Sequence, residues 1–111
     1  MRRLFFALAI ICTAFSLPAE AAKKIAFVIG INDYKEIPKL EKAVGDAEAI
    51  ASTLSGLGYQ VTTALNMDRR NLNLALSKLY ASIEPGDTVL LHYSGHGIQI
   101  ENDNYLLPAD V

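Results

Sequence analysis

Three stretches of the 111-residue chain have the hydrophobic pattern of β-strands. Residues 25–31 form a near-continuous apolar run. A second continuous run begins at Thr88, and it is typical of a strand that is buried on both faces. Between these runs, Val61, Thr63 and Leu65 alternate with polar neighbours, which predicts a strand covered on one face only.

Two further stretches have the spacing of amphipathic helices. Apolar residues recur every three or four positions over 43–57, and Gly58 is a natural end for that helix. A second stripe covers 72–83, where Asp68 can cap the helix and Met67 and Leu72 are spaced as a hydrophobic staple. The sequence Glu-Pro-Gly-Asp at 84–87 then turns the chain into the strand at Thr88.

The predicted order is therefore β-α-β-α-β, an α/β fold with a parallel sheet. The linkers are short, so we expect right-handed crossovers that place the helices against the sheet. Residues 98–111 follow with no element that the pattern predicts. Two helices can cover only part of a parallel sheet. We therefore expect residues 22–111 to be an incomplete domain, the first half of a larger one.

The first 21 residues have the pattern of an export signal. Met1-Arg2-Arg3 is a basic start, residues 4–17 are apolar, and Ala19 and Ala21 are small residues at the two positions that a signal peptidase reads. The apolar run is shorter than the roughly 20 residues that span a bilayer. We expect cleavage after Ala21, export to the periplasm or the extracellular space, and no membrane span in the mature chain.

The only cysteine of the chain, Cys12, lies inside this predicted signal. Residues 22–111 therefore contain neither a disulfide nor a thiol nucleophile. The formal net charge of the chain is −2, which does not favour a nucleic-acid partner.

His96 is the residue placed best for chemistry. It follows the strand that begins at Thr88, and glycines at 95 and 97 flank it. Strand ends at the carboxyl edge of an α/β sheet are where such folds bind ligands, and a histidine there can transfer protons near neutral pH.

Other kinds of site fit the residues less well. His92 and His96 would be roughly 13 Å apart along one strand face, and no nearby carboxylate or cysteine completes a metal site, so we expect no metal and no cofactor. His92 is most simply a core histidine with a local hydrogen-bond partner. Ser94 lacks the glycine two residues earlier that a nucleophile elbow requires, and Gly30 alone is not a dinucleotide-binding fingerprint.

The sequence resembles the caspase-like cysteine peptidases, including the metacaspases, over residues 24–111. The segment Tyr-Ser-Gly-His-Gly at 93–97, followed by Tyr-Leu-Leu-Pro-Ala-Asp at 105–110, is similar to the catalytic-histidine segment of that family. The residues at 30–34 resemble the opening segment of the family, and those at 40–47 resemble its metacaspase branch.

This resemblance implies a cysteine-type endopeptidase, a thiol protease that acts on peptides or proteins. His96 then aligns with the catalytic histidine, and Gly97 with the glycine whose N–H contributes to the oxyanion hole. Asp46 aligns with an acidic residue that favours Arg or Lys before the scissile bond, although a carboxylate near a helix N-terminus is an equal explanation. The family's cysteine follows the histidine, so we expect it beyond residue 111 and expect this chain to be inactive alone.

Two alternatives remain at this point. The chain could be a non-catalytic pseudo-enzyme or a peptide-binding module that uses the same cleft. It could also be a flavodoxin-like ligand-binding half-domain, although that reading leaves the histidine segment unexplained.

Overall fold

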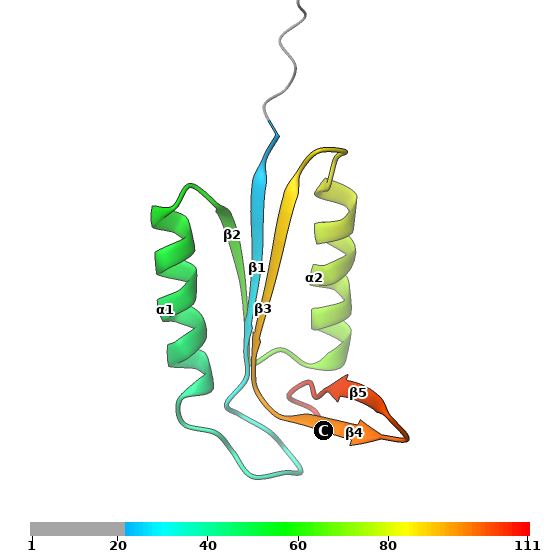
Figure 1. Cartoon of the computed structure of the whole chain (residues 1–111). Helices are drawn as coiled ribbons and strands as arrows, with labels where there is room; N and C mark the ends of the chain where they lie inside the picture. The colour runs from blue at the N-terminus through cyan, green and yellow to red at the C-terminus, as the bar shows by residue number, and fades with distance from the viewer. Residues whose placement is uncertain (1–21) are drawn as a thin grey trace, which may run out of the picture.

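The computed structural model describes residues 22–111, so the predicted export signal at 1–21 and Cys12 lie outside the described residues. The described part is an α/β unit with two helices, a parallel sheet of three strands in the order β2-β1-β3, and a separate two-stranded hairpin (Figure 1). No helix within 22–111 is long and apolar enough to cross a membrane. The predicted fold class is confirmed. The elements are β1 (Lys24–Gly30), α1 (Ala43–Gly56), β2 (Gln60–Leu65), α2 (Arg69–Ser82), β3 (Thr88–Ser94), β4 (Gly97–Ile100) and β5 (Asp103–Leu106).

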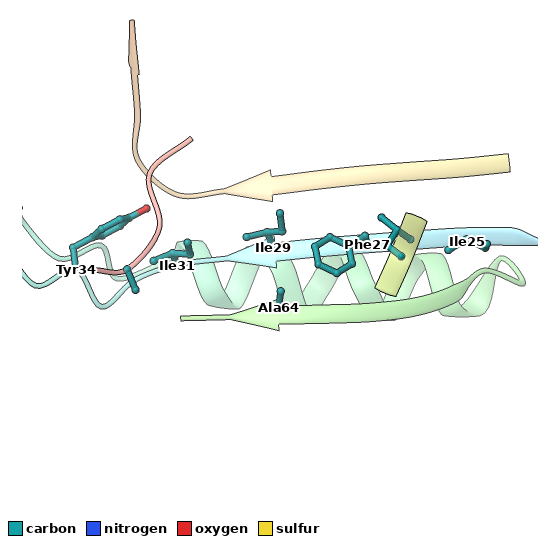
Figure 2. Close-up of a cluster of buried hydrophobic side chains, with 8 residues drawn as sticks. Ile25, Phe27, Ile29, Ile31, Tyr34 and Ala64 are labelled. Carbon is teal, nitrogen blue, oxygen red and sulfur yellow. The ribbon is translucent and has the colours of Figure 1, made fainter. Parts of the chain in front are cut away.

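The central strand β1 carries the core because its side chains alternate between two helix-covered faces. Phe27, which is fully buried, points with its neighbours toward the α2 side, where Leu79 belongs to the same cluster (Figure 2). Val28 points to the opposite face and packs in a cluster with Ala47 and Leu54 of α1. The helices therefore lie on opposite sides of the sheet (Figure 1).

Helix α1 approaches the carboxyl end of β1 closely, and Gly30 makes this possible. A Cβ atom at Gly30 would lie 2.6 Å from the Cβ of Ala47, a separation that real atoms do not adopt. This contact fixes the start of α1 next to the end of the central strand. The first turn of α1 thereby becomes part of the carboxyl edge of the sheet.

The second helix begins as the sequence predicts. The Asp68 side chain accepts a hydrogen bond from the Asn71 N–H at 2.8 Å, which caps α2. Met67 and Leu72 both pack against the core cluster on the α2 side, as expected for a staple. Gly58 follows α1 with a φ of +89°, which suits a glycine just after a helix.

The prediction that the strand beginning at Thr88 is buried on both faces is wrong. β3 pairs only with β1 among the described residues and lies at the edge of the sheet. Val89 is 41% exposed and Leu91 is 50% exposed. β1 is buried instead, since strands flank it on both sides and a helix covers each face.

The hairpin of β4 and β5 occupies part of the tail for which the sequence pattern predicts no element. Its two-residue turn consists of Glu101 and Asn102, whose φ angles are 49° and 71°. Two positive φ angles in succession match the type I′ turn, which suits the twist of a hairpin. The hairpin lies at the carboxyl end of the sheet (Figure 1) and follows directly after His96 in the chain.

Candidate active site at the carboxyl edge of the sheet

His96 lies in the short connection between β3, which ends at Ser94, and β4, which begins at Gly97. The loop after β1 runs beside it, because β1 and β3 end together: Gly30 pairs with Ser94, and the Ile31 N–H donates to the Ser94 carbonyl at 3.0 Å. The parallel register therefore brings the loop at 31–42 and the histidine to one edge of the sheet.

The imidazole of His96 is held by a carbonyl group of that loop. Its Nε2 lies 2.8 Å from the Pro38 carbonyl oxygen. A carbonyl oxygen can only accept, so Nε2 must carry the proton in this hydrogen bond. In a neutral ring, Nδ1 is then the unprotonated nitrogen, and it is the atom able to take a proton.

Two asparagines fix the loop that carries Pro38. The Asn66 side chain accepts from the N–H groups of Asn32 and Asp33, at 2.9 and 3.2 Å. The Asn32 side chain in turn accepts from the N–H of Val44 in the first turn of α1, at 3.1 Å. Asn66 has a φ of 51°, a left-handed conformation that asparagine tolerates better than most residues. The loop is therefore tied to both β2 and α1.

The main chain at His96 is held by two tyrosine hydroxyls. The His96 N–H donates to the hydroxyl of Tyr34 at 2.8 Å, and that hydroxyl donates to the Leu107 carbonyl at 3.0 Å. The Tyr93 hydroxyl donates to the His96 carbonyl at 2.6 Å, and it also lies 3.2 Å from the Tyr34 hydroxyl. Burial raises the pKa of Tyr93 well above its ordinary value, so this hydroxyl keeps its proton.

Gly95 is required by the same pair of hydroxyls. A Cβ atom there would lie 2.6 Å from the Tyr93 oxygen and 2.7 Å from the Tyr34 oxygen. Any other residue would therefore displace the tyrosines. The glycine before His96 has a packing role, which the sequence alone does not reveal.

Gly97 pairs with Leu106 at the end of the β4–β5 ladder. In a hairpin with a two-residue turn, Ile100 and Asp103 form a hydrogen-bonded pair, and the pairs alternate from there. Gly97 and Leu106 are then a pair without mutual hydrogen bonds, so the Gly97 N–H points away from β5.

Asp46 lies in the first turn of α1, at the same edge of the sheet. It lines an open hollow of about 520 Å³ together with Ser94 and Gly95, and the side chain is exposed. Asp46 therefore shares this hollow with the two residues that precede His96. The hollow is also lined by Lys39, Leu40, Glu41, Lys42 and Ala43, so cations share its rim with the two carboxylates.

His92 and His96 have different hydrogen-bond partners. The Nε2 of His92 lies 2.8 Å from the Ser94 hydroxyl, and the residue is half-buried, as expected for a histidine with a local partner. The estimate that both histidines face the same way along one strand is wrong, because β3 ends at Ser94 and the chain turns before His96. The sequence does not predict that Pro38, Tyr34 and Tyr93 contact His96. No local pattern marks these residues, because their contacts depend on how the chain folds.

Comparison with known proteins identifies relatives over the same residues. The family described as "Caspase domain" matches residues 23–111. The human mucosa-associated lymphoid tissue lymphoma translocation protein 1 is 28% identical over 81% of this chain. Metacaspase-1 of Mycosarcoma maydis is 32% identical over 79% of the chain. In Saccharomyces cerevisiae strain YJM789, metacaspase-1 is 30% identical over 79% of the chain.

A solved structure has the same fold. The crystal structure of protein GSU0716 from Geobacter sulfurreducens matches with a TM-score of 0.62 and 31% sequence identity, over 68% of this chain and 31% of that one. The chain spans 11% of the length of the human relative, and 27% and 25% of the two metacaspases. Since the family match covers residues 23–111 and the parallel sheet agrees with it, the chain belongs to the caspase domain family.

Proposed function

We propose that this chain carries the histidine part of a cysteine-type endopeptidase, with His96 as the proton-transfer residue. The hydrogen bond of 2.8 Å between His96 Nε2 and the Pro38 carbonyl carries the proposal. It commits one ring nitrogen to the protein and leaves Nδ1 as the base, at the sheet edge where this fold class binds ligands. The family relationship supports peptidase chemistry, because the relatives include metacaspases.

The proposed reaction is an acyl transfer in two stages. Nδ1 of His96 takes the proton of a cysteine thiol, and the thiolate attacks the peptide carbonyl carbon. The Gly97 N–H stabilises the negative charge that develops on the carbonyl oxygen. The imidazolium, still held through Nε2–H by Pro38, then gives the Nδ1 proton to the departing amine, and water hydrolyses the thioester. Residues 22–111 contain no cysteine, so the proposed reaction takes its thiol from a cysteine beyond residue 111, as the family resemblance implies.

Substrate choice is proposed to depend on Asp46. Its exposed carboxylate lines the hollow next to Ser94 and Gly95, which are two residues and one residue before His96. A cationic side chain placed there would pair with the carboxylate, and the planar guanidinium of Arg would pair better than the ammonium of Lys. The expected substrates are peptides or proteins with Arg or Lys before the scissile bond.

The alternative is a non-catalytic peptide-binding module. The hollow at Asp46 supports this alternative, since binding of a cationic side chain there needs no nucleophile. A binding module would retain an Arg peptide without cleaving it. A cysteine-type endopeptidase would release two fragments.

We also propose that the protein is exported, with the mature chain starting at Ala22. This proposal is supported by the basic start, the apolar run and the small residues at 19 and 21. Mass spectrometry of the gene product isolated from its source cell measures the first residue directly. Retention of Met1 on the isolated product would contradict export by this route.

The experiment for the function uses the native gene product and three matched fluorogenic peptides that end in Arg, Lys or Asp. We expect cleavage of the Arg peptide first, the Lys peptide second, and no measurable cleavage of the Asp peptide. The binding alternative predicts fluorescence anisotropy changes with the Arg peptide and no fragments by mass spectrometry. Preference for the Asp peptide would contradict the role of Asp46.

A further inference from the structure

The hydroxyls of Tyr34 and Tyr93 contact the main chain of His96 and Leu107, the residues that flank the β4–β5 hairpin. His96 and Leu107 lie just beyond the last pair of the β4–β5 ladder, Gly97 and Leu106, and would be the next hydrogen-bonded pair if the ladder continued. One of their two bonds is made, since the Leu107 N–H donates to the His96 carbonyl at 3.1 Å. The second bond, from the His96 N–H to the Leu107 carbonyl, is replaced by the Tyr34 hydroxyl, which accepts from the first group and donates to the second.

Tyr34 also contacts the imidazole itself. Its ring lies 4.8 Å from the ring of His96, centroid to centroid, with the planes tilted by 57°. The tyrosine is only 2% exposed, so its position is fixed by packing in the core cluster. A single side chain from the loop after β1 therefore supports the ring of His96 and holds its N–H.

Tyr93 holds the carbonyl group of His96, whereas Tyr34 holds its N–H. Its hydroxyl donates to the His96 carbonyl at 2.6 Å and lies 3.0 Å from the Leu107 carbonyl. The Tyr34 hydroxyl thus supplies the acceptor for the His96 N–H, and the Tyr93 hydroxyl is a second donor to the His96 carbonyl, beside the Leu107 N–H. Neither hydroxyl is needed for the sheet, whose strands β2, β1 and β3 pair through their own main chains.

We propose that Tyr34 and Tyr93 are positioning residues for His96: the Tyr34 hydroxyl replaces one main-chain bond just beyond the β4–β5 ladder, and both hydroxyls fix the main chain of His96, so that the ring reaches the Pro38 carbonyl with Nδ1 free. This inference rests on the proposed function for its catalytic meaning. The positioning itself is a property of the chain and can be measured without any peptidase activity.

The test is nuclear magnetic resonance on the full chain, with Tyr34→Phe and Tyr93→Phe as variants. Phenylalanine keeps the ring and removes only the hydroxyl. Tyr80→Phe is the matched control, because Tyr80 is 70% exposed on α2. The chain has only two histidines, so the ring nitrogens of His96 are readily assigned, with His92 as an internal reference.

In Tyr34→Phe the His96 N–H loses its acceptor, so its amide hydrogen exchange should rise roughly fivefold or more, while exchange in the middle of β1 stays the same. The two ring nitrogen shifts of His96 should move toward each other as the Nε2–H tautomer becomes less favoured, and those of His92 should not move. Tyr93→Phe should change the ring shifts of His96 in the same direction. Tyr80→Phe should match the parent in every measurement.

Unchanged exchange and unchanged ring shifts in both variants would overturn the proposal. If Tyr34→Phe fails to fold, Tyr93→Phe and Gly95→Ala decide the question, because an alanine Cβ would displace both hydroxyls. A parallel kinetic measurement on the native gene product should show a lower kcat with unchanged KM for Tyr34→Phe. If the parent cleaves no peptide, the proposed function fails, whereas the resonance data still decide the positioning role.

Discussion

Replacing Asp46 by Asn should weaken cleavage before Arg by about fivefold. The substitution keeps the size of the side chain and removes its charge. A fully desolvated charge pair is worth roughly 2–5 kcal/mol when one partner is truncated. Asp46 is exposed, and its hollow is open and carries Lys39 and Lys42 on the rim. The ion pair between Asp46 and a substrate Arg is therefore expected to contribute about 1 kcal/mol, near the upper limit for solvent-exposed ion pairs. This free energy corresponds to about fivefold in kcat/KM.

The assay compares kcat/KM for the Arg peptide between the native gene product and its variants, with the Asp peptide as the reference that is not cleaved. Glu48→Gln is the control, since Glu48 is another exposed carboxylate of α1 and lies outside the lining of the hollow. We expect the Arg preference to fall in Asp46→Asn and to stay the same in Glu48→Gln. Equal losses in both variants would show that overall charge is responsible. No loss in either would mean that Asp46 serves only the N-terminus of α1.

Three further predictions concern stability. The Asp87 carboxylate accepts hydrogen bonds from the N–H groups of Glu84 and Lys23, and these bonds lower its pKa. The stability that this carboxylate contributes is therefore present above pH of about 4 and is lost on acidification. The unfolding midpoint of Asp87→Asn should lie below that of the parent at neutral pH and converge with it in acid. The raised pKa of Tyr93 makes its contribution complete below pH of about 10 and lost above it, and Tyr93→Phe should remove this alkaline loss in a denaturant titration. Phe27→Ala should cost roughly 3–5 kcal/mol in urea unfolding, whereas Leu74→Ala, at a position that is 53% exposed, should cost far less; equal losses would contradict the assignment of the core.

Local patterns in the sequence predict most of the fold. The helix cap at Asp68 and the helix end at Gly58 are local signals, and both are confirmed. The burial of β3 is not a local property, because a continuous apolar run does not reveal whether a strand is central or at an edge. The β4–β5 hairpin escapes a hydrophobic pattern since its strands are short and exposed, although Asn102 in a two-residue turn is a signal that could have found it.

The candidate site likewise has parts that the sequence predicts and parts that it does not. Parallel topology predicts that Asp46 lies at the same carboxyl edge as His96, and Asp46 lines a hollow together with Ser94 and Gly95, the two residues before His96. The partners of His96 are 58 residues away at Pro38 and 62 residues away at Tyr34. Such contacts depend on the path of the loop at 31–42, which the asparagine side chains determine and which no periodicity encodes.

The most direct test of the proposed role of His96 is the rate at which an arginyl ketone probe alkylates a thiol of the native gene product. Activation of the thiol by proton transfer predicts that His96→Gln slows labelling by at least about a hundredfold. The control His92→Gln removes the other histidine and should label at nearly the parental rate. Labelling of His96→Gln at the parental rate, or equal losses in both variants, would contradict His96 as the residue that activates the nucleophile.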